Sequence, residues 1–308
     1  MVSMQELIDK ASVLVEALPY IRRFAGKTFV IKYGGQAMIS EELKNTVMLD
    51  LILLNYIGIN TILVHGGGKE ITELMNRLGK KPQFANGLRV TDQETMELAE
   101  MVLVGKVNKE IVSKINRHGG NAVGLSGKDG NLFLAARRQP QKVNIDGEEK
   151  FVDLGFVGDI KQVNPEILCH LTASGYIPVI SPIASGEAGE TLNINADHAA
   201  GALARALKAE KLILLTDVEG IFADPEDKQS LLSSITREHA DTLIREGKIS
   251  KGMIPKVESC LMAMENKITS THIIDGRIPH SLLLEIFTDE GIGSMVVHKN
   301  GEERRLIK

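Results

Sequence analysis

Short apolar runs alternate with helix-forming segments along most of this chain. The run TFVIKY, from Thr28, precedes a helical pattern from about Ser40 to Ile57, and TILVHGGG precedes another from about Lys69 to Leu78. A long helical pattern from about Asp92 to Asn116 and the run NAVGLSG follow. Because the apolar runs are short and helices separate them, the alternation predicts right-handed βαβ units around a mainly parallel sheet.

One region departs from this alternation. Between about residues 132 and 163, short pieces such as FLAARR and EKFVDLGFVGDIKQV predict hairpins, and therefore an antiparallel excursion. The βα pattern resumes with IPVISP, a helix from about Ala196 to Leu207, KLILLTDVEG, THIID and SMVVH. We expect an α/β fold of two lobes, with the boundary just before Lys211.

The first 25 residues carry the signals of a separate helix. Ser3 and Glu6 have the spacing of a capping box. Pro19 should kink or end the helix, because its ring collides with the carbonyl four residues earlier. One face of this helix is apolar and consists of Leu7, Ala11, Leu14, Leu18 and Ile21. The helix can lie on its own domain, or it can contact another chain.

Composition argues against several classes of protein. The chain has 308 residues, of which 43% are hydrophobic and 25% charged, and its net charge of −4 argues against a general nucleic-acid binder. Cys169 and Cys260 stand alone, so no disulfide framework or zinc site is indicated. Asp50 and Asn55 interrupt the longest apolar run. We expect no nucleic-acid partner, no membrane attachment and a cytoplasmic location.

Two strand ends carry glycines directly before a helix. Gly34 and Gly35 follow the first apolar run, while Gly67 and Gly68 belong to the HGGG stretch after the second. A helix start after a glycine turn can bind an anion, because backbone amides point at the turn and no side chain blocks them. Either turn alone can be an ordinary tight connection. Two of them in consecutive βα units predict a shared phosphate site.

The common nucleotide fingerprints do not fit. Gly26-Lys27-Thr28 resembles the end of a P-loop, but Ile21 stands where the first glycine is required, and a strand follows. LSGKDG has Ala122 where that glycine belongs. The GxGxxG pattern is missing after the first strand, which argues against a nicotinamide dehydrogenase.

Four further stretches near predicted element ends are rich in groups that bind anions. They are NGLRVT around Arg89, LNINADHAA at 192–200, LLTDVEGIF at 214–222 and SKGMIPK ending at Lys256. Together with KYGG and HGGG, in this order, they closely resemble the amino acid kinase family from about Lys27 to the C-terminus. Within that family, HGGG, NGLRVT and NINAD together are similar to the N-acetyl-L-glutamate kinases.

The resemblance implies an activity and a fold. The expected reaction transfers the γ-phosphoryl group of ATP, supplied with Mg²⁺, to the side-chain carboxylate of N-acetyl-L-glutamate in arginine biosynthesis. The expected fold is an open, mainly parallel αβα sandwich. Residues 26–209 would form the acyl-amino-acid lobe, and residues 210–308 would form the ATP lobe with a C-terminal regulatory region.

The resemblance also assigns residues. Lys32 and Lys256 match the lysines that contact the transferring phosphoryl group, and Asp197 matches the aspartate that orients them. Gly35 is expected to make room beside Lys32. The substrate contacts correspond to Gly67, Gly68, Arg89, Asn193 and Asn195. The nucleotide contacts correspond to Gly34, Gly35, Thr216, Asp217, Val218, Gly220, Ile221 and Met253. No metal ligand is assigned.

The chemistry of this reaction requires cations. A carboxylate approaching a phosphoryl group is an anion meeting an anion, and two unit charges at ~4 Å repel by about 4 kcal/mol at an effective dielectric of about 20. Lys32 and Lys256 could offset that repulsion, and Arg89 could hold the substrate's α-carboxylate in two parallel hydrogen bonds. An ionised carboxylate needs no general base. We therefore expect His65 to close its strand and pack near the turn.

Regulation by arginine is a further implication. The N-terminal helix resembles the extension of arginine-inhibited members of the family, in which such helices interlace to join dimers into a homohexamer. The stretch IDGRIPHSLLLEIFTDEGIGSMV resembles their arginine-binding region, and we expect Tyr20, Glu285 and Gly293 to bind arginine there. Arginine would inhibit by changing how open the two lobes are.

Other interpretations stay open at this point. Glutamate 5-kinase, aspartokinase and carbamate kinase share the Lys-Gly-Gly start, and a non-catalytic arginine-sensing protein could use the same fold. Taken singly, the assigned residues also have ordinary structural roles. Lys32 can be a solvated lysine at a strand end, Asp197 an early-helix residue, Arg89 a surface residue and Glu285 a salt-bridged helix residue.

Overall fold

The computed structural model describes residues 3–38, 40–85, 87–145, 148–224, 226–249, 252–265, 268, 270–289 and 291–297. Parts of the expected motifs and lobes lie outside these ranges. They are Asn86 of NGLRVT, Ser250 and Lys251 of SKGMIPK, Glu290 of the stretch expected to bind arginine, residues 39, 146–147, 225, 266–267 and 269 of the lobes, and residues 1–2 and 298–308 at the chain ends.

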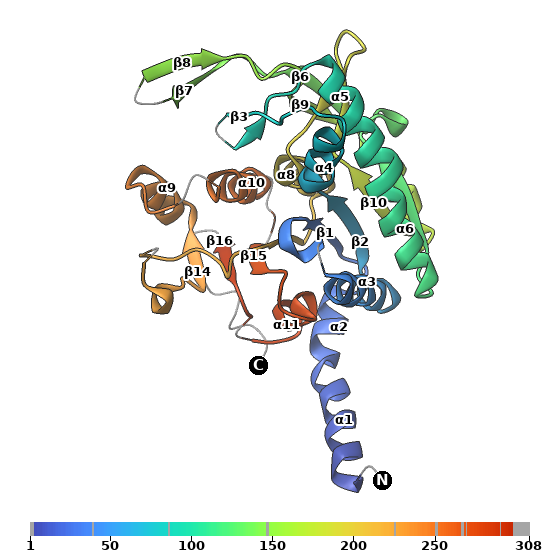
Figure 1. The fold of residues 1–308 in the computed structure, drawn as a ribbon. Coiled ribbons are helices and arrows are strands. Elements are labelled where there is room, and N and C mark those ends of the chain that lie inside the picture. The colour runs from blue at the N-terminus through green and yellow to red at the C-terminus, as the bar shows by residue number, and fades with distance from the viewer. Residues whose placement is uncertain are drawn as a thin grey trace.

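A mainly parallel sheet runs through the molecule (Figure 1). In the described residues it has eight strands in the order β14-β16-β15-β13-β1-β2-β10-β5, and only β15 and β16 pair antiparallel. The strands are β1 (Thr28–Tyr33), β2 (Asn60–His65), β5 (Ala122–Ser126), β10 (Ile177–Ser181), β13 (Lys211–Thr216), β14 (Ser234–Thr236), β15 (Ser270–Asp275) and β16 (Ser294–Val297). The predicted α/β fold with a mainly parallel sheet is confirmed.

The strand order reverses beside β1. From β1 the sheet continues through β2, β10 and β5 on one side and through β13, β15, β16 and β14 on the other. Connections that leave neighbouring strands in opposite directions open a crevice at the carboxyl ends of those strands. Lys32, in register with Val64 of β2 and Leu214 of β13, stands at this crevice.

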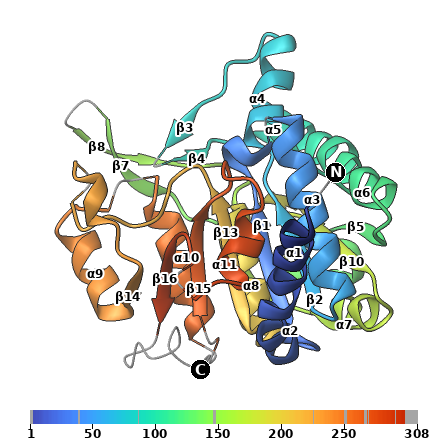
Figure 2. The same cartoon turned by 90° about the horizontal axis from the view of Figure 1, so that it is seen from below.

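Helices cover both faces of the sheet (Figures 1 and 2). The first face carries α3 (Glu41–Tyr56), α4 (Gly68–Arg77), α5 (Gln93–Glu100), α6 (Asn108–Arg117) and α11 (Ser281–Ile286). The second face carries α7 (Glu166–Ala173), α8 (Ala196–Leu207), α9 (Arg237–Arg245) and α10 (Ile254–Met264). The predicted αβα sandwich is confirmed.

Alternation along β1 decides where its side chains point. Phe29, Ile31 and Tyr33 belong to the core under the first face, while Val30 belongs to the core under the second. Because successive side chains of a strand point to opposite faces, Lys32 joins Val30 on the side of α8 and α10.

The predicted antiparallel excursion is confirmed. Strands β6 (Phe133–Arg137) and β9 (Gly158–Val163) pair antiparallel in a second sheet with β11 (Ile183–Gly186) and β12 (Thr191–Asn193). A hairpin of β7 (Gln141–Ile145) and β8 (Glu148–Val152) extends from the body in Figure 1. The short pair β3 (Phe84–Ala85) and β4 (Leu88–Arg89) lies near α4.

The long helix predicted from about Asp92 to Asn116 is confirmed, with one difference. Asp92 caps its start, since the Asp92 carboxylate accepts a hydrogen bond of 2.8 Å from the Thr95 amide. Between α5 and α6, however, residues Met101–Val107 form π-helical turns, which the periodicity did not predict. Such turns are rare and occur frequently at functional sites.

The N-terminal segment forms α1 (Met4–Glu16) and α2 (Leu18–Phe24). The capping box is confirmed, and α1 ends just before Pro19 as expected. Helix α1 projects from the rest of the chain in Figure 1, and the side chains on its apolar face are exposed, Leu14 to 75%. Helix α1 therefore does not lie on its own domain, whereas α2 does, because Tyr20 and Phe24 are buried in the core.

Asp50 of α3 is buried and contacts His280, next to α11, whose side chain is about half exposed. His280 Nδ1 lies 2.6 Å from Asp50 Oδ1, and Asp50 Oδ2 has no hydrogen-bond partner in the described residues. Asp50 is 1% exposed. Burial raises the pKa of Asp50 to about 6, although the bond and charge of His280 act in the opposite direction.

The Asp50→Asn substitution tests this burial. The pKa of Asp50 is higher in the folded state than in the unfolded state, so unfolding between about pH 4 and pH 6 releases a proton. The wild-type protein therefore loses stability as the pH rises through this range. Asparagine does not ionise. Relative to the wild type, the variant should gain up to about 3 kcal/mol of unfolding free energy as the pH rises through this window, at about 1.4 kcal/mol per pKa unit.

Urea unfolding at several pH values between about 4 and 7.5 measures the difference. Asp241→Asn, which changes an exposed carboxylate on α9, is the matched control. A stability difference between wild type and Asp50→Asn that is the same at every pH would contradict the expectation.

Candidate active site

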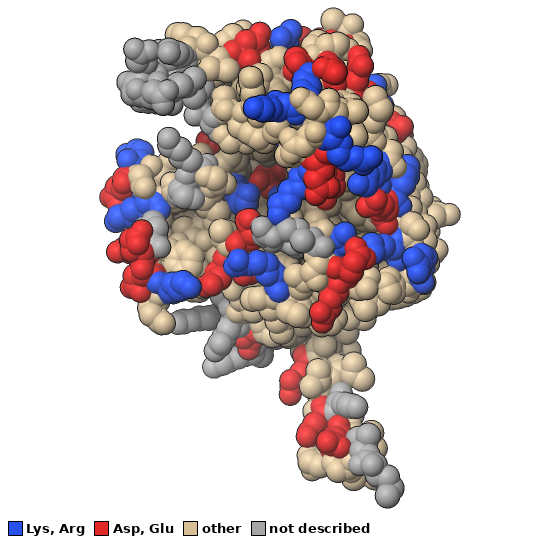
Figure 3. Space-filling view, in the orientation of Figure 1, with Lys and Arg blue, Asp and Glu red and all other residues tan. Residues whose placement is uncertain are grey.

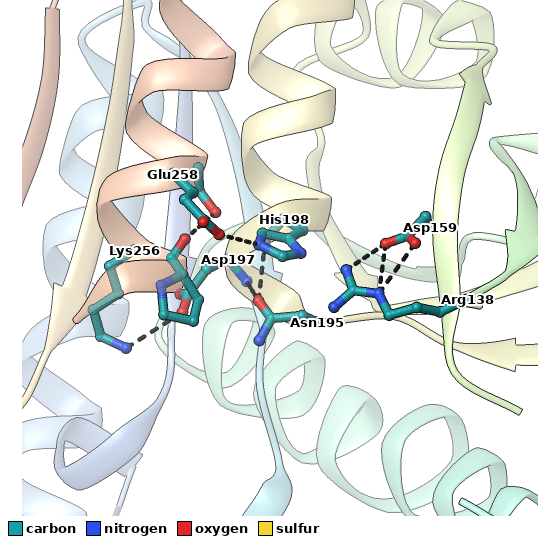
Figure 4. A network of polar contacts seen from close by, with 9 residues as sticks. Arg138, Asp159, Asn195, Asp197, His198, Lys256 and Glu258 are labelled. Carbon is teal, nitrogen blue, oxygen red and sulfur yellow. Dashed lines mark hydrogen bonds and ion pairs between the residues drawn. The ribbon is translucent and has the colours of Figure 1, made fainter. Parts of the chain in front are cut away.

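Three charged side chains from three elements meet at the carboxyl end of β1. Lys32 Nζ lies 2.9 Å from Asp197 Oδ1, and Lys256 Nζ of α10 lies 3.3 Å from Asp197 Oδ2. Lys32 is 8% exposed and Asp197 5%. Asp197 therefore holds one ammonium group at each carboxylate oxygen. We call these three residues the lysine–aspartate cluster; Figure 4 shows Asp197 and Lys256 within it.

The start of α8 favours a carboxylate at Asp197. Asn195 caps the helix, because its Oδ1 accepts hydrogen bonds from the amides of Asp197 (2.9 Å) and His198 (3.1 Å) (Figure 4). The helix N-terminus also attracts negative charge. Burial by itself would raise the pKa of Asp197, but the charges of Lys32 and Lys256 outweigh it and hold the pKa at about 2.

Close packing of α8 and α10 brings Lys256 to Asp197. A Cβ at Gly201 of α8 would lie 2.8 Å from the backbone oxygen of Ser259 in α10, so glycine permits the approach. Pro255 stands in the first turn of α10, where a missing amide hydrogen is tolerated. The sequence thus fixes the distance between the two helices and the start of α10.

The KYGG turn makes room for the Lys32 side chain at a different glycine from the one expected. A Cβ at Gly34 would lie 3.0 Å from Lys32 Nζ, whereas the nearest atom to a Cβ at Gly35 belongs to Asp217 at 3.9 Å. Gly35 is instead required for its φ of 69°, which other residues rarely adopt. The expectation that Gly35 makes room beside Lys32 is therefore wrong.

A cavity of about 190 Å³ opens at the HGGG turn. Among its lining residues are all five residues expected to contact substrate: Gly67, Gly68, Arg89, Asn193 and Asn195. We call it the HGGG cavity. A Cβ at Gly67 would lie 2.5 Å from Leu103 Cδ2, so no side chain fits there. The apolar lining residues Phe84, Leu88, Leu103 and Pro182 were not expected, because apolar residues carry no sequence signal for binding.

Arg89 is a buried cation in this cavity. Its Nη2 donates to Gly68 O (2.7 Å) and Thr72 Oγ1 (2.8 Å), and its guanidinium lies 4.8 Å from the centre of the Phe84 ring. It is 7% exposed, and burial lowers its pKa. No carboxylate of the described residues pairs with it. The alternative role of surface residue is wrong, and the site can accept an anion.

A second cavity, of about 120 Å³, lies where β13 ends and α10 begins. We call it the Met253 cavity. Its lining includes four residues expected to contact nucleotide, namely Val218, Gly220, Ile221 and Met253, together with the unexpected Phe222, Lys248 and Ile249. Thr216 and Asp217 lie at the end of β13 without lining it, and Thr216 Oγ1 accepts a hydrogen bond from the Val218 amide.

A third cavity, of about 50 Å³, lies between α2 and α11 and contains Tyr20 and Glu285. We call it the Tyr20 cavity. Tyr20 donates to Asp289 (2.6 Å), and Glu285 Oε2 accepts from the Gly293 amide (3.3 Å), so the three residues expected to bind arginine lie close together. Gly293 itself does not line the cavity.

Polar residues of β13 and β15 complete the Tyr20 cavity. His272 Nδ1 donates to Glu285 Oε1 (2.6 Å), and His272 Nε2 accepts from Lys211 (2.9 Å). Ser270 also contacts His272. Glu285 thus accepts a buried hydrogen bond from His272, and the salt bridge of its ordinary structural role would require a protonated ring. Lys211, Ser270 and His272 were not expected at this site, although polar residues in otherwise apolar strands were an available signal.

The face of the molecule drawn in Figure 3 carries mixed charge. Figure 3 shows it hollowed near the middle of the face, where basic and acidic side chains lie together. In the described part of the chain, no helix is long and apolar enough to span a bilayer.

Comparison with known proteins identifies the family. Residues 27–275 match the model of the amino acid kinase family. This chain belongs to the amino acid kinase family. It is 59% identical to the acetylglutamate kinase of Pelotomaculum thermopropionicum, over 94% of this chain and 98% of that relative. It is 55% identical to the acetylglutamate kinase of Methanocaldococcus jannaschii, over 95% and 98% respectively. The resemblance to N-acetyl-L-glutamate kinases is confirmed.

Solved structures share the fold. An N-acetylglutamate synthase from Neisseria gonorrhoeae, complexed with coenzyme A and N-acetyl-glutamate, superposes with a TM-score of 0.79 at 28% identity; 94% of this chain is covered, but only 63% of the synthase chain. Carbamate kinase from Giardia lamblia bound to AMP-PNP gives a TM-score of 0.65 at 17% identity, over 89% and 99% of the two chains. This amino acid kinase family member is a kinase enzyme, and its family implies the use of ATP.

Removing the shared counter-ion tests the lysine–aspartate cluster. In Asp197→Asn, the ammonium groups of Lys32 and Lys256 lose their carboxylate, and removing one partner of a buried ion pair costs about 3–5 kcal/mol. We expect a lower thermal unfolding temperature. Inorganic phosphate should then raise the unfolding temperature of the variant more than that of the wild type, because the anion supplies the missing charge.

Thermal unfolding with and without phosphate, at constant ionic strength, measures both effects. Glu258→Gln, which removes a half-exposed carboxylate from α10, is the control. Equal phosphate responses in all three proteins would contradict the expectation.

Proposed function

We propose that this kinase phosphorylates the side-chain carboxylate of N-acetyl-L-glutamate and forms N-acetyl-L-glutamyl 5-phosphate, an early step of arginine biosynthesis. The observation that carries the proposal is buried Arg89, which has no carboxylate partner in the described residues and lines a cavity next to the lysine–aspartate cluster. Asn195 joins the two, because it lines the HGGG cavity and caps the turn that holds Asp197. Relatives named acetylglutamate kinase support the acceptor.

The cluster suits transfer between two anions. Lys32 comes from β1 and Lys256 from α10, so their charges can reach a phosphoryl group from two sides. Asp197 keeps both ammonium groups in place before substrate arrives, which removes reorganisation from the reaction itself. Phosphoryl transfer needs mainly alignment and charge stabilisation, and these three residues supply both.

Arg89 fits the α-carboxylate of the acceptor. Its Nη2 is held by Gly68 and Thr72, its Nη1 contacts only the sulfur of Met75, and its Nε has no partner in the described residues. The remaining N–H groups form a rigid fork that matches a carboxylate. Asn195 has its oxygen committed to the helix cap, so its Nδ2 is the group left for the acyl substrate, with Asn193 beside it.

The Met253 cavity fits the nucleotide. Its walls are mainly apolar and can cover the flat base of the nucleotide. Lys256 follows Met253 by one turn of α10, so the phosphates of a nucleotide in this cavity would extend toward the lysine–aspartate cluster. Mg²⁺, brought by the ATP phosphates, would neutralise part of their charge. In the described residues no group of three or more His, Cys, Asp or Glu side chains could hold a metal ion, so we assign it no ligand.

Arginine is proposed as an inhibitor that binds in the Tyr20 cavity. Glu285 and Asp289 supply carboxylates for a guanidinium or an amino group, and Tyr20 brings α2 into the same cavity. A structure of the Neisseria gonorrhoeae synthase complexed with L-arginine shares this fold at 26% identity, with a TM-score of 0.77 and 94% of this chain and 65% of that chain covered. The proposed effect is a change in the opening of lobes 26–209 and 210–308.

A homohexamer is proposed as the assembly, and the exposed apolar face of α1 supports contact between copies of the chain. Leu7 and Leu14 of α1, and Leu18 at the start of α2, are about half exposed or more, and they recur at helical spacing. An apolar face on a projecting helix can be covered by the same helix of another copy, which removes it from water.

Lys32→Ala tests the catalytic assignment. We expect ADP release dependent on N-acetyl-L-glutamate to fall by on the order of 10²-fold or more, because a charge that stabilises the transferring group is lost. A coupled assay of ADP measures it. Lys27→Ala, at the exposed side chain just before β1, should leave the rate within about threefold of the wild type.

Two results would contradict the proposed function. Glutamate without the acetyl group reacting as well as N-acetyl-L-glutamate would make the acceptor wrong. Absence of ATP turnover in the wild type with any carboxylate or carbamate acceptor would instead favour a non-catalytic arginine-sensing protein.

Glu285→Gln tests the proposed inhibition. In the wild type, millimolar arginine should raise the apparent KM for N-acetyl-L-glutamate, and the variant should lose most of this response, since glutamine supplies no charge to a guanidinium. Initial rates with and without arginine measure the effect. Glu166→Gln, an exposed residue of α7, should respond like the wild type. A wild-type KM that arginine leaves unchanged would rule out this mode of inhibition.

A further inference from the structure

His65 and Asn108 form a buried polar contact that the proposed mechanism does not use. His65 ends β2 and is fully buried. Its Nδ1 lies 2.7 Å from the backbone oxygen of Gly66, and its Nε2 lies 3.2 Å from Asn108 Nδ2. Asn108 is also fully buried and begins α6 directly after the π-helical turns.

Asn108 ties three neighbouring strands together. Besides His65 of β2, its Nδ2 contacts the backbone oxygens of Val179 in β10 (2.9 Å) and Leu125 in β5 (3.3 Å). The sequence leaves space for this side chain, because a Cβ at Gly124 would lie 1.9 Å from Asn108 Oδ1. The Asn108 amide is therefore fixed from several directions and offers His65 a stationary donor.

The partners of His65 determine its tautomer. A backbone carbonyl can only accept, so Nδ1 carries the hydrogen and donates to Gly66, and Nε2 is left to accept from Asn108. A protonated ring would place two donors against each other at Asn108. Burial, together with the charge of Lys109, lowers the pKa of His65 to about 4, although the Gly66 contact acts in the opposite direction. His65 is thus a neutral donor to the turn.

This hydrogen bond fixes the orientation of a peptide group in the HGGG turn. The described part of the chain contains no cis peptide bond, so the Gly66 carbonyl and the Gly67 N–H point in opposite directions. Since the carbonyl points at the buried His65, the N–H points away from it, and both glycines line the HGGG cavity. The Gly67 N–H has no hydrogen-bond partner in the described residues.

The peptide needs such a restraint because it joins two glycines. Glycine has no Cβ and populates many backbone conformations, so a Gly-Gly peptide can turn over at little steric cost. The Gly66 amide is already held, since it donates to the Tyr33 oxygen at 2.8 Å. The His65 bond holds the carbonyl side of the same residue.

We propose that His65, supported by Asn108, is a positioning residue that keeps the Gly67 N–H directed into the HGGG cavity, where this N–H donates to the negatively charged phosphoryl oxygens during transfer. The expected effect of His65 on the rate rests on the proposed kinase reaction. Neither residue touches the reacting atoms. In other enzymes, removing one hydrogen-bond donor that points at developing charge lowers kcat by about 10²–10³-fold.

A matched pair of substitutions separates the two contacts of His65. In His65→Asn, the side-chain amide reaches the position of Nδ1 and keeps the donor to Gly66, but it loses Asn108. In His65→Gln, the amide reaches the position of Nε2 and keeps the contact with Asn108, but it loses Gly66. We expect kcat to fall about 10- to 100-fold in His65→Gln, with the KM values of both substrates within about threefold of the wild type. His65→Asn should recover most of that loss.

Thermal unfolding of each variant accompanies the kinetics. Ile115→Val, which removes a buried methyl group from α6, serves as a control for stability loss without a change at the turn. The double variant His65→Gln/Asn108→Leu should be no slower than His65→Gln, because Asn108 acts through His65. Equal kcat in His65→Gln and the wild type, or equal losses in the Asn and Gln variants, would overturn the inference.

A crystal structure of His65→Gln gives a readout that does not depend on activity. We expect the Gly66–Gly67 peptide to be turned over or to occupy two orientations. A peptide that keeps the wild-type orientation would overturn the inference even if activity fell. Absence of turnover of N-acetyl-L-glutamate by the wild type would count against the proposed function, while the orientation in the crystal would still decide the role of His65.

Discussion

The buried carboxylate of Asp197 between two ammonium groups is the interaction on which the arrangement of this molecule depends. Two lysines that approach each other inside a protein repel strongly, because few water molecules screen them. Asp197 removes that repulsion, but only if β1, α8 and α10 are held in one relative position. The alternation along β1, the Asn195 cap and the close contact at Gly201 each fix one of these elements.

Much of the fold could be predicted because its signals are local. The apolar runs, the Ser3 and Asp92 caps and the break before Pro19 act within a few residues of where they occur. The π-helical turns at Met101–Val107 could not be predicted from periodicity. They lie against α4 and the distant HGGG turn, where a Cβ at Gly67 would meet the side chains of Leu103 and Val107. The exposure of α1 could not be predicted either, because a helix that packs on its own domain has the same pattern of apolar residues.

The candidate site divides in a similar way. Charged and amide residues in short motifs were expected, and the structure places them around the crevice. Apolar residues that line a cavity, such as Phe222 and Ile249, cannot be told from core residues in the sequence. His272 and Asn108 act through partners that are distant in sequence, so their roles needed the fold. Gly34 and Gly35 have different roles that the motif does not distinguish. Gly34 leaves space for the Lys32 side chain, whereas Gly35 adopts a positive φ.

The projecting α1 helix has a consequence for how the chain responds to dilution. Isolated helices shorter than about 12–15 residues are only marginally stable in water, and α1 has 13 residues with its apolar face exposed. If another copy covers that face, helix formation and association become one equilibrium governed by mass action. The helical content of Met4–Glu16 would then rise with protein concentration, while the α/β body keeps its structure.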